Sequence, residues 1–165
     1  PNLNIIFIDN SNLNIFYDIF HHSCENFSYY FTPNFANISH MVEKYNWKIT
    51  ALMIDNKLWA YYIFQNLFLD YNEDGVNKNV IKNIINYYDK TVKKEIFILG
   101  FMISLSLMSK DLKNEYFLIE NVGDNTIITK SLFEKYKPVK QYENYVYLYN
   151  FSYYPKESKN VLMMI

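Results

Sequence analysis

The sequence predicts an α/β protein in which helices flank a mixed, largely antiparallel, twisted sheet. Runs of β-branched and aromatic residues alternate along the chain with segments whose apolar residues recur every three or four positions. Half of the 165 residues are hydrophobic, which is enough to build a sizeable core. Only three Gly and four Pro punctuate the chain, and no linker or repeat divides it. We therefore expect residues 1–165 to form a single domain.

The first half of the chain predicts a strand followed by two helices. Leu3–Ile8 is a short apolar strand, and Asp9–Ser11 supplies good N-cap residues for a helix with apolar positions from Leu13 to Phe20. Pro33 breaks the chain, and apolar residues then recur at helical spacing over Phe35–Tyr45. One face of each helix is therefore expected to pack on the core.

A hairpin is expected next. Ile49–Ile54 and Leu58–Leu69 are rich in strand-forming residues, and Asp55-Asn56-Lys57 between them is a polar tight turn. Tyr71–Lys78 contains the polar run Asn-Glu-Asp-Gly and is expected to be a solvated loop.

The second half is harder to assign from periodicity alone. The apolar residues of Val80–Tyr88 suit a helix, whereas Ile96–Met108 fits a buried strand or a buried helix equally well. The remaining expectations are a strand at Tyr116–Glu120, a helix at Thr129–Tyr136 with Leu132 and Phe133 inward, and strands at Tyr145–Phe151 and Asn160–Ile165.

The last five residues, Val161–Ile165, are all apolar. Most chain ends are polar and frayed, so this tail is expected to dock as a strand. Its α-carboxylate then lies in or beside the core, where solvent or a cation has to reach it. The simpler alternative is an edge strand whose carboxylate meets water.

Composition excludes several classes of function. Sixteen Lys, no Arg and seventeen acidic residues leave a net charge of -1, so no nucleic-acid footprint is present. Cys24 is the single cysteine and no secretory leader opens the chain, which together favour a cytoplasmic location. The longest apolar stretch, Ile96–Met108, is shorter than the roughly 20 residues of a membrane span.

No metal site or nucleophile is expected. His21, His22 and Cys24, with His40 farther on, match no standard zinc spacing, and Cys24 lacks a recognisable catalytic context. The acidic segment 72–75 is too short for a calcium loop.

The expected order of elements is compatible with the acyl-CoA N-acyltransferase, or GNAT-like, fold. Short sequence motifs indicate a more specific resemblance. Tyr147–Phe151, reading Tyr-Leu-Tyr-Asn-Phe and followed by an apolar C-terminus, resembles the end of the eukaryotic N-myristoyltransferases. Upstream elements follow in that family's order: Phe31-Thr32-Pro33, His40, Met53-Ile54-Asp55, the strand Leu58–Leu69, Glu120-Asn121 and Ser131–Lys135. The likeness covers nearly the whole chain and corresponds to that family's C-terminal half.

This resemblance implies a strand at Asn83–Asp89, a buried helix at Ile96–Lys110 and a function. These enzymes transfer myristoyl from myristoyl-CoA to the N-terminal glycine of proteins. In them the C-terminal carboxylate accepts the proton of the amine, a role that would fall on Ile165. The resemblance also implies peptide contacts by five residues: Tyr142, Glu143, Asn144, Tyr145 and Met164.

Two departures from the family limit what is carried over. Lys140–Asn144 stands where the family has a Gly-Asp-Gly-Asn turn, which leaves the peptide preference open. The family's acyl-CoA pocket belongs to its other half, and Gly75, Gly100 and Gly123 are isolated, so no glycine-rich phosphate loop replaces it.

We therefore expect this chain to bind no cofactor itself, and to work with an acyl-CoA-binding half of the same or another chain. Myristoyl-CoA is then a co-substrate of the complete enzyme, and N-terminal glycine peptides or proteins are partners. The alternatives are a diverged, non-catalytic peptide- or protein-binding module and an unrelated GNAT-like acyltransferase.

Overall fold

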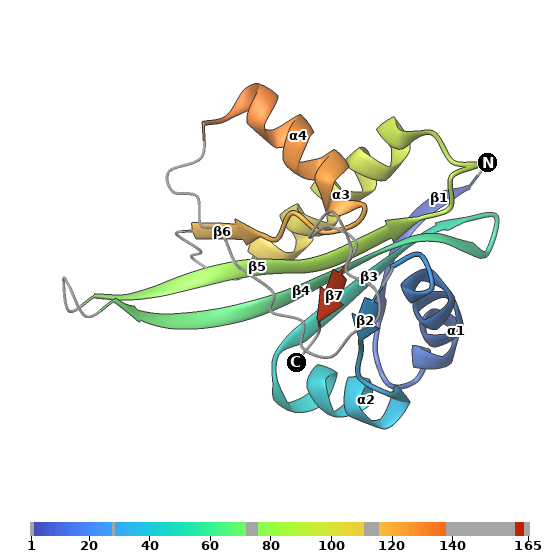
Figure 1. Ribbon diagram of the computed structural model, residues 1–165, viewed down its shortest axis with the longest axis horizontal. Coiled ribbons are helices and arrows are strands. Elements are labelled where there is room, and N and C mark those ends of the chain that lie inside the picture. The colour runs from blue at the N-terminus through green and yellow to red at the C-terminus, as the bar shows by residue number, and fades with distance from the viewer. Residues whose placement is uncertain (1, 28, 72–75, 111–115, 138–160, 164–165) are drawn as a thin grey trace.

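The computed structural model describes residues 2–27, 29–71, 76–110, 116–137 and 161–163. Its main sheet has five strands in the order β1-β3-β4-β5-β6. They are β1 (Leu3–Ile8), β3 (Trp47–Ile54), β4 (Lys57–Tyr71), β5 (Val76–Tyr88) and β6 (Tyr116–Ile119). All neighbours are antiparallel except β5 and β6, which are parallel. The predicted fold class, a mixed and largely antiparallel sheet flanked by helices, is confirmed (Figure 1).

Helices cover both faces of this sheet. α1 (Leu13–Cys24) and α2 (Phe35–Lys44) contribute to one buried apolar cluster, and α3 (Lys94–Ser109) and α4 (Asn125–Lys135) contribute to the other. A second, two-stranded sheet pairs β2 (Tyr29–Phe31) with β7 (Val161–Met163) in parallel. β2 is a strand that the sequence did not predict.

The first two helices lie where their apolar periodicity placed them. α2 begins after Asn34, whose side-chain carbonyl accepts a hydrogen bond from the backbone N–H of Asn37 at 2.9 Å. The cap expected for α1 from Asp9–Ser11 is wrong, because Asn12 holds the N-cap position and makes no capping bond there. The Asp9 carboxylate instead accepts from the backbone N–H of Ser11.

The hairpin between β3 and β4 is confirmed, with a turn at Asp55 and Asn56. Both residues have positive φ, 50° and 63°, as a tight hairpin turn of matching twist requires. The solvated loop expected over Tyr71–Lys78 is wrong in extent, because β4 continues to Tyr71 and β5 begins at Val76. The two strands form an arm that projects beyond the rest of the sheet (Figure 1).

Val80–Tyr88 belongs to β5, so the helix suggested by its spacing is wrong. The strand that the resemblance implied at Asn83–Asp89 is confirmed up to Tyr88, where β5 ends. β5 is a central strand with helices on both sides, so its apolar residues do not alternate with polar ones. A bulge adds to the effect: Ile63 pairs with Ile85 and Phe64 with Asn83, which leaves Ile84 unpaired. Ile84 and Ile85 therefore both contribute to the α1–α2 cluster, and the bulge produces the three- and four-residue steps.

The remaining predictions are mostly confirmed. α3 settles Ile96–Met108 as a buried helix, and β6 lies where a strand was expected. α4 begins four residues earlier than predicted, at Asn125, and Phe133 does not face inward, since its side chain is 44% exposed. The strand expected at Tyr145–Phe151 lies outside the described residues. None of the described helices is long and apolar enough to cross a membrane.

Candidate functional site

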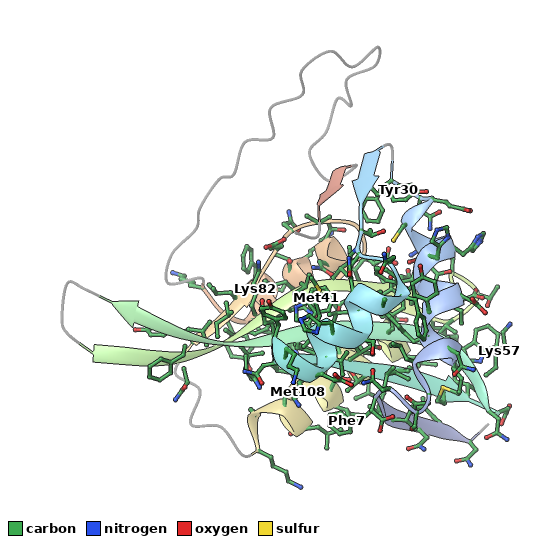
Figure 2. All side chains as sticks on the ribbon, turned by 90° about the horizontal axis from the view of Figure 1, so that it is seen from below. Phe7, Tyr30, Met41, Lys57, Lys82 and Met108 are labelled. Carbon is green, nitrogen blue, oxygen red and sulfur yellow. The ribbon has the colours of Figure 1, made fainter. Side chains whose placement is uncertain are left out.

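The C-terminal segment is anchored next to the main sheet. In the β2–β7 pair the backbone of Tyr29 lies opposite Val161, that of Tyr30 opposite Leu162 and that of Phe31 opposite Met163. The expected docking of the apolar tail as a strand is therefore confirmed for these three residues. Figure 2 shows Tyr30 on β2 beside β7, on the side of the sheet opposite Met108 of α3.

Each residue that the resemblance assigned to peptide binding or proton transfer lies outside the described part of the chain. These residues are Tyr142, Glu143, Asn144, Tyr145, Met164 and Ile165. The described strand β7 ends at Met163, two positions before Ile165. Their assigned roles therefore stay predictions.

A second feature is the end of the parallel β5–β6 pair. β6 pairs with Val80–Asn83 only, whereas β5 continues to Tyr88 and stays paired with β4 on its other side. The β6 side of Ile84–Tyr88 is thus a strand edge at the carboxyl end of a parallel pair. Such edges present free N–H and C=O groups, and in α/β sheets ligands commonly bind there.

In this chain the edge is occupied by side chains from the start of α4. The Asn125 side-chain carbonyl accepts from the Asn86 N–H at 2.7 Å, and its amide donates to the Ile84 carbonyl at 3.1 Å and the Glu120 carbonyl at 2.8 Å. Asp124 accepts from the Tyr88 N–H at 3.2 Å. Every hydrogen-bonding group named here thus has an internal partner.

Two further groups of contacts, one around Lys90 and one between Asn83 and Asn86, hold this arrangement together. The Lys90 ammonium lies 2.6 Å from both Asp124 oxygens and 3.8 Å from the centre of the Tyr88 ring. Asn83 and Asn86 donate to each other's carbonyl oxygens at 2.9 and 2.8 Å. Asn83, Asn86 and Asn125 are all at most 2% exposed. The sequence analysis missed this buried amide cluster, for which the concentration of Asn in and after β5 was the available signal.

α3 follows β5 after a short connecting turn, and its start does not form a glycine-lined phosphate cradle. No side chain caps this helix end, where Lys93 holds the N-cap position and Lys94 is the first helical residue. Asp89 accepts hydrogen bonds from the hydroxyl and backbone N–H of Thr91, which closes the connecting turn and lowers the pKa of the Asp89 carboxyl. The turn is therefore braced by its own acidic side chain, which disfavours a second anion.

These observations test whether acyl-CoA fits along β5. The first turn of α3 carries the acidic residue Glu95. The pantetheine arm of acyl-CoA carries two amide groups, and the N–H groups of Asn86 and Tyr88 that could pair with such amides already bond Asn125 and Asp124. In this structure the N–H groups of Asn86 and Tyr88 are therefore not free to pair with the amides of a ligand.

The cysteine and histidines form no alternative site in the described part of the chain. Burial raises the pKa of the Cys24 thiol to about 11, so the thiolate needed for nucleophilic attack is scarce at neutral pH. His22 is exposed and pairs with Glu25 at 3.0 Å. Within the described ranges, no three His, Cys, Asp or Glu side chains converge as metal ligands.

Comparison with known proteins supports the fold. No family model matches the sequence, and no curated protein matches it. Solved structures do match, among them a ribosomal-protein-alanine N-acetyltransferase from Brucella melitensis biovar Abortus 2308. That match has a TM-score of 0.65 and 10% identity over 90% of this chain and 100% of the other.

Two further matches agree. An aminoglycoside acetyltransferase from an uncultured soil metagenomic sample has a TM-score of 0.67 and 12% identity, covering 89% of this chain and 96% of the other. A predicted acetyltransferase from Clostridium acetobutylicum, crystallised with acetyl-CoA, has a TM-score of 0.67 and 8% identity, covering 88% and 96%. The chain therefore has the GNAT-like fold that these acetyltransferases share, and identities this low establish the fold alone.

Proposed function

We propose that this chain takes part in N-acyl transfer as the domain that binds the amine substrate. The GNAT-like fold is compatible with this reaction class. The observation that carries the assignment is the β2–β7 pair, which fixes Val161–Met163 in a sheet two residues before Ile165. A carboxylate that serves as a proton acceptor needs such a fixed support, because catalysis gains most from groups already held in position.

The finer proposal is transfer of myristoyl from myristoyl-CoA to an N-terminal glycine. An α-amine has a pKa of about 7.7–8.0 and attacks a thioester only after losing a proton. The terminal carboxylate of Ile165 is proposed to pair with the ammonium and to accept that proton. Tyr142, Glu143, Asn144, Tyr145 and Met164 are proposed to contact the peptide, following the resemblance to the N-myristoyltransferases.

The experiment measures binding of a glycine peptide to the purified chain by fluorescence anisotropy. Two peptides are compared, one with a free N-terminal glycine and one acetylated at that glycine. A charged hydrogen bond contributes about 1.5–3 kcal/mol, so the free amine should bind at least about tenfold more tightly. Equal affinity for both peptides would contradict the proposal.

A matched variant tests the carboxylate itself. One alanine added after Ile165 moves the terminal charge by one residue and leaves β7 unchanged. The preference for the free amine should then disappear, while the circular dichroism spectrum and urea midpoint stay those of the wild type. If the extended chain keeps the full preference, Ile165 is not the partner of the amine.

A second candidate is an acyltransferase that works with this domain alone. This candidate is favoured because the alignment with the acetyltransferases reported above spans 96–100% of their own chains, so each of them has no large additional domain. Mass spectrometry of a peptide incubated with the isolated chain and acetyl-CoA or myristoyl-CoA separates the two. Acylated peptide would favour the second candidate, whereas the first expects transfer only when an acyl-CoA-binding domain is present.

A further inference from the structure

Asn125 makes two of the bonds that a neighbouring parallel strand would make. In a parallel ladder, the residue opposite Ile85 accepts from the N–H of Asn86 and donates to the carbonyl of Ile84. The Asn125 side-chain amide makes both bonds, at 2.7 and 3.1 Å. Its carboxamide therefore takes the place of a peptide group in the ladder beyond the end of β6.

The Asp124 carboxylate continues the same edge. The next N–H that points to this side is that of Tyr88, which donates to Asp124 at 3.2 Å. Lys90 bonds both oxygens of that carboxylate and holds it in place. The two adjacent side chains thus cover both N–H groups of the β5 edge beyond Ile84.

This closure is stable for physical reasons. Asn125 is fully buried and Asn86 is 2% exposed, so losing the carboxamide would leave buried backbone groups without partners. The reciprocal Asn83–Asn86 bonds fix the neighbouring part of β5 from within the same cluster. A ligand at this edge would have to displace the hydrogen bonds that Asn125 and Asp124 already make with β5.

We propose that Asn125 and Asp124 act as a built-in ligand that closes the β5 edge and excludes the pantetheine arm of acyl-CoA from this domain. That arm carries two amide groups and would need the N–H groups of Asn86 and Tyr88. The inference rests on the proposed function only in leaving acyl-CoA to another domain. Asn125 and Asp124 are then the residues whose contacts with β5 require acyl-CoA to bind to another domain.

The first test uses the wild-type chain and amide hydrogen exchange followed by NMR, with coenzyme A and myristoyl-CoA as probes. The amides of Asn86 and Tyr88 should exchange slowly, and neither probe should change their exchange or chemical shifts. A probe that binds and perturbs these two amides would overturn the inference. This result needs no variant, so it stands even where a substitution impairs folding.

The second test compares Asn125→Ala with Asn121→Ala, which removes an exposed carboxamide from the loop that precedes α4. Asn125→Ala should speed exchange of the Asn86 amide by about tenfold or more, and Asn121→Ala should leave it unchanged. Coenzyme A should slow that exchange again in Asn125→Ala alone. If the edge opens but coenzyme A has no effect, Asn125 does not stand in for a ligand.

The two proposals fail separately. The glycine-peptide assay reports on the C-terminal carboxylate, whereas amide exchange reports on the backbone of β5. Loss of the free-amine preference would leave the closed edge intact, and binding of coenzyme A at β5 would leave the peptide result intact.

Discussion

The contact between α3 and β4 yields a prediction that can be worked out atom by atom. Gly100 faces the Tyr62 ring, and a Cβ placed there would overlap the hydroxyl oxygen and lie 3.1 Å from Cζ. Tyr62 is fully buried, stacks on Phe97 and donates a hydrogen bond to the Phe97 carbonyl at 2.8 Å. Gly100→Ala must therefore push the ring away from a well-packed position.

The expected magnitude follows from three contributions. Overpacking costs about 1–3 kcal/mol, and the displaced hydrogen bond costs about 1 kcal/mol. Replacing Gly by Ala within a helix returns about 1 kcal/mol. Gly100→Ala should lower the free energy of unfolding by about 1–3 kcal/mol, and by much less in a Tyr62→Phe background, where the overlapping oxygen is absent.

Urea unfolding of the wild type, both single variants and the double variant measures this coupling. The double-mutant cycle should give an interaction energy of about 1–3 kcal/mol, since the two sites are in contact. If the two substitutions add to within about 0.5 kcal/mol, the close approach of Gly100 to the hydroxyl does not govern the cost, and the reasoning is refuted.

Three further predictions concern pH, a buried bond and a helix cap. Burial raises the pKa of Cys24 from its ordinary value of 9.0 to about 11 and raises that of Tyr61 well above its usual range, so the folded chain keeps protons that the unfolded chain loses. The free energy of unfolding, measured in urea, should not depend on these groups below pH 9 and should fall as the pH rises from about 9 to 11. Cys24→Ala should make that fall smaller. A wild-type free energy that stays constant over this range would contradict the prediction. Ser23→Ala removes the 2.6 Å partner of the Tyr61 hydroxyl and should cost about 1–3 kcal/mol, less when combined with Tyr61→Phe, and equal costs in both backgrounds would exclude the bond. Asn34→Ala should lower stability by about 1 kcal/mol through loss of the α2 cap, whereas Asn37→Ala within the helix should have little effect, and equal effects would refute the capping role.

The local sequence pattern predicted those elements in which one face is buried and the other is exposed to solvent. α2 is the clear case, because apolar residues at three- and four-residue steps follow a proline and an asparagine that can cap. The β3–β4 turn is another, since Asp55 and Asn56 are residue types that tolerate positive φ. In such segments the pattern of side chains and the local backbone preference point to the same structure.

The same reasoning failed where burial is two-sided or where a contact is non-local. β5 is covered on both faces and contains a bulge at Ile84, so neither strict alternation nor apolar periodicity describes it. β2 is only three residues long, and its partner β7 lies about 130 residues farther along the chain. No local pattern specifies such a pairing.

The candidate site shows the same limit. An asparagine such as Asn125, taken alone, reads as a helix-start residue, and its position opposite Ile85 depends on where β6 ends. The absence of a glycine-rich phosphate loop, by contrast, could be predicted from the sequence alone. Such a loop needs glycine at the start of α3, and no glycine occurs between Tyr88 and Ile98. A feature that depends on the local residue type, such as a glycine loop, was therefore predictable. A contact between residues far apart in the sequence, such as that of Asn125 with β5, was not.

Two features of the fold bear on how acyl transfer could be divided. The β5 edge, where an amide-bearing arm would lie, is filled by Asn125 and Asp124, while β7 holds the chain close to its last residue on the opposite side from α3. A domain that gave up acyl-CoA binding would no longer need an open edge, and closing it removes unpaired backbone groups that would otherwise destabilise the sheet. A domain that kept amine binding would still need its carboxylate on a fixed support. The closed edge and the anchored tail are therefore what we expect of the amine-binding partner in a two-domain acyltransferase.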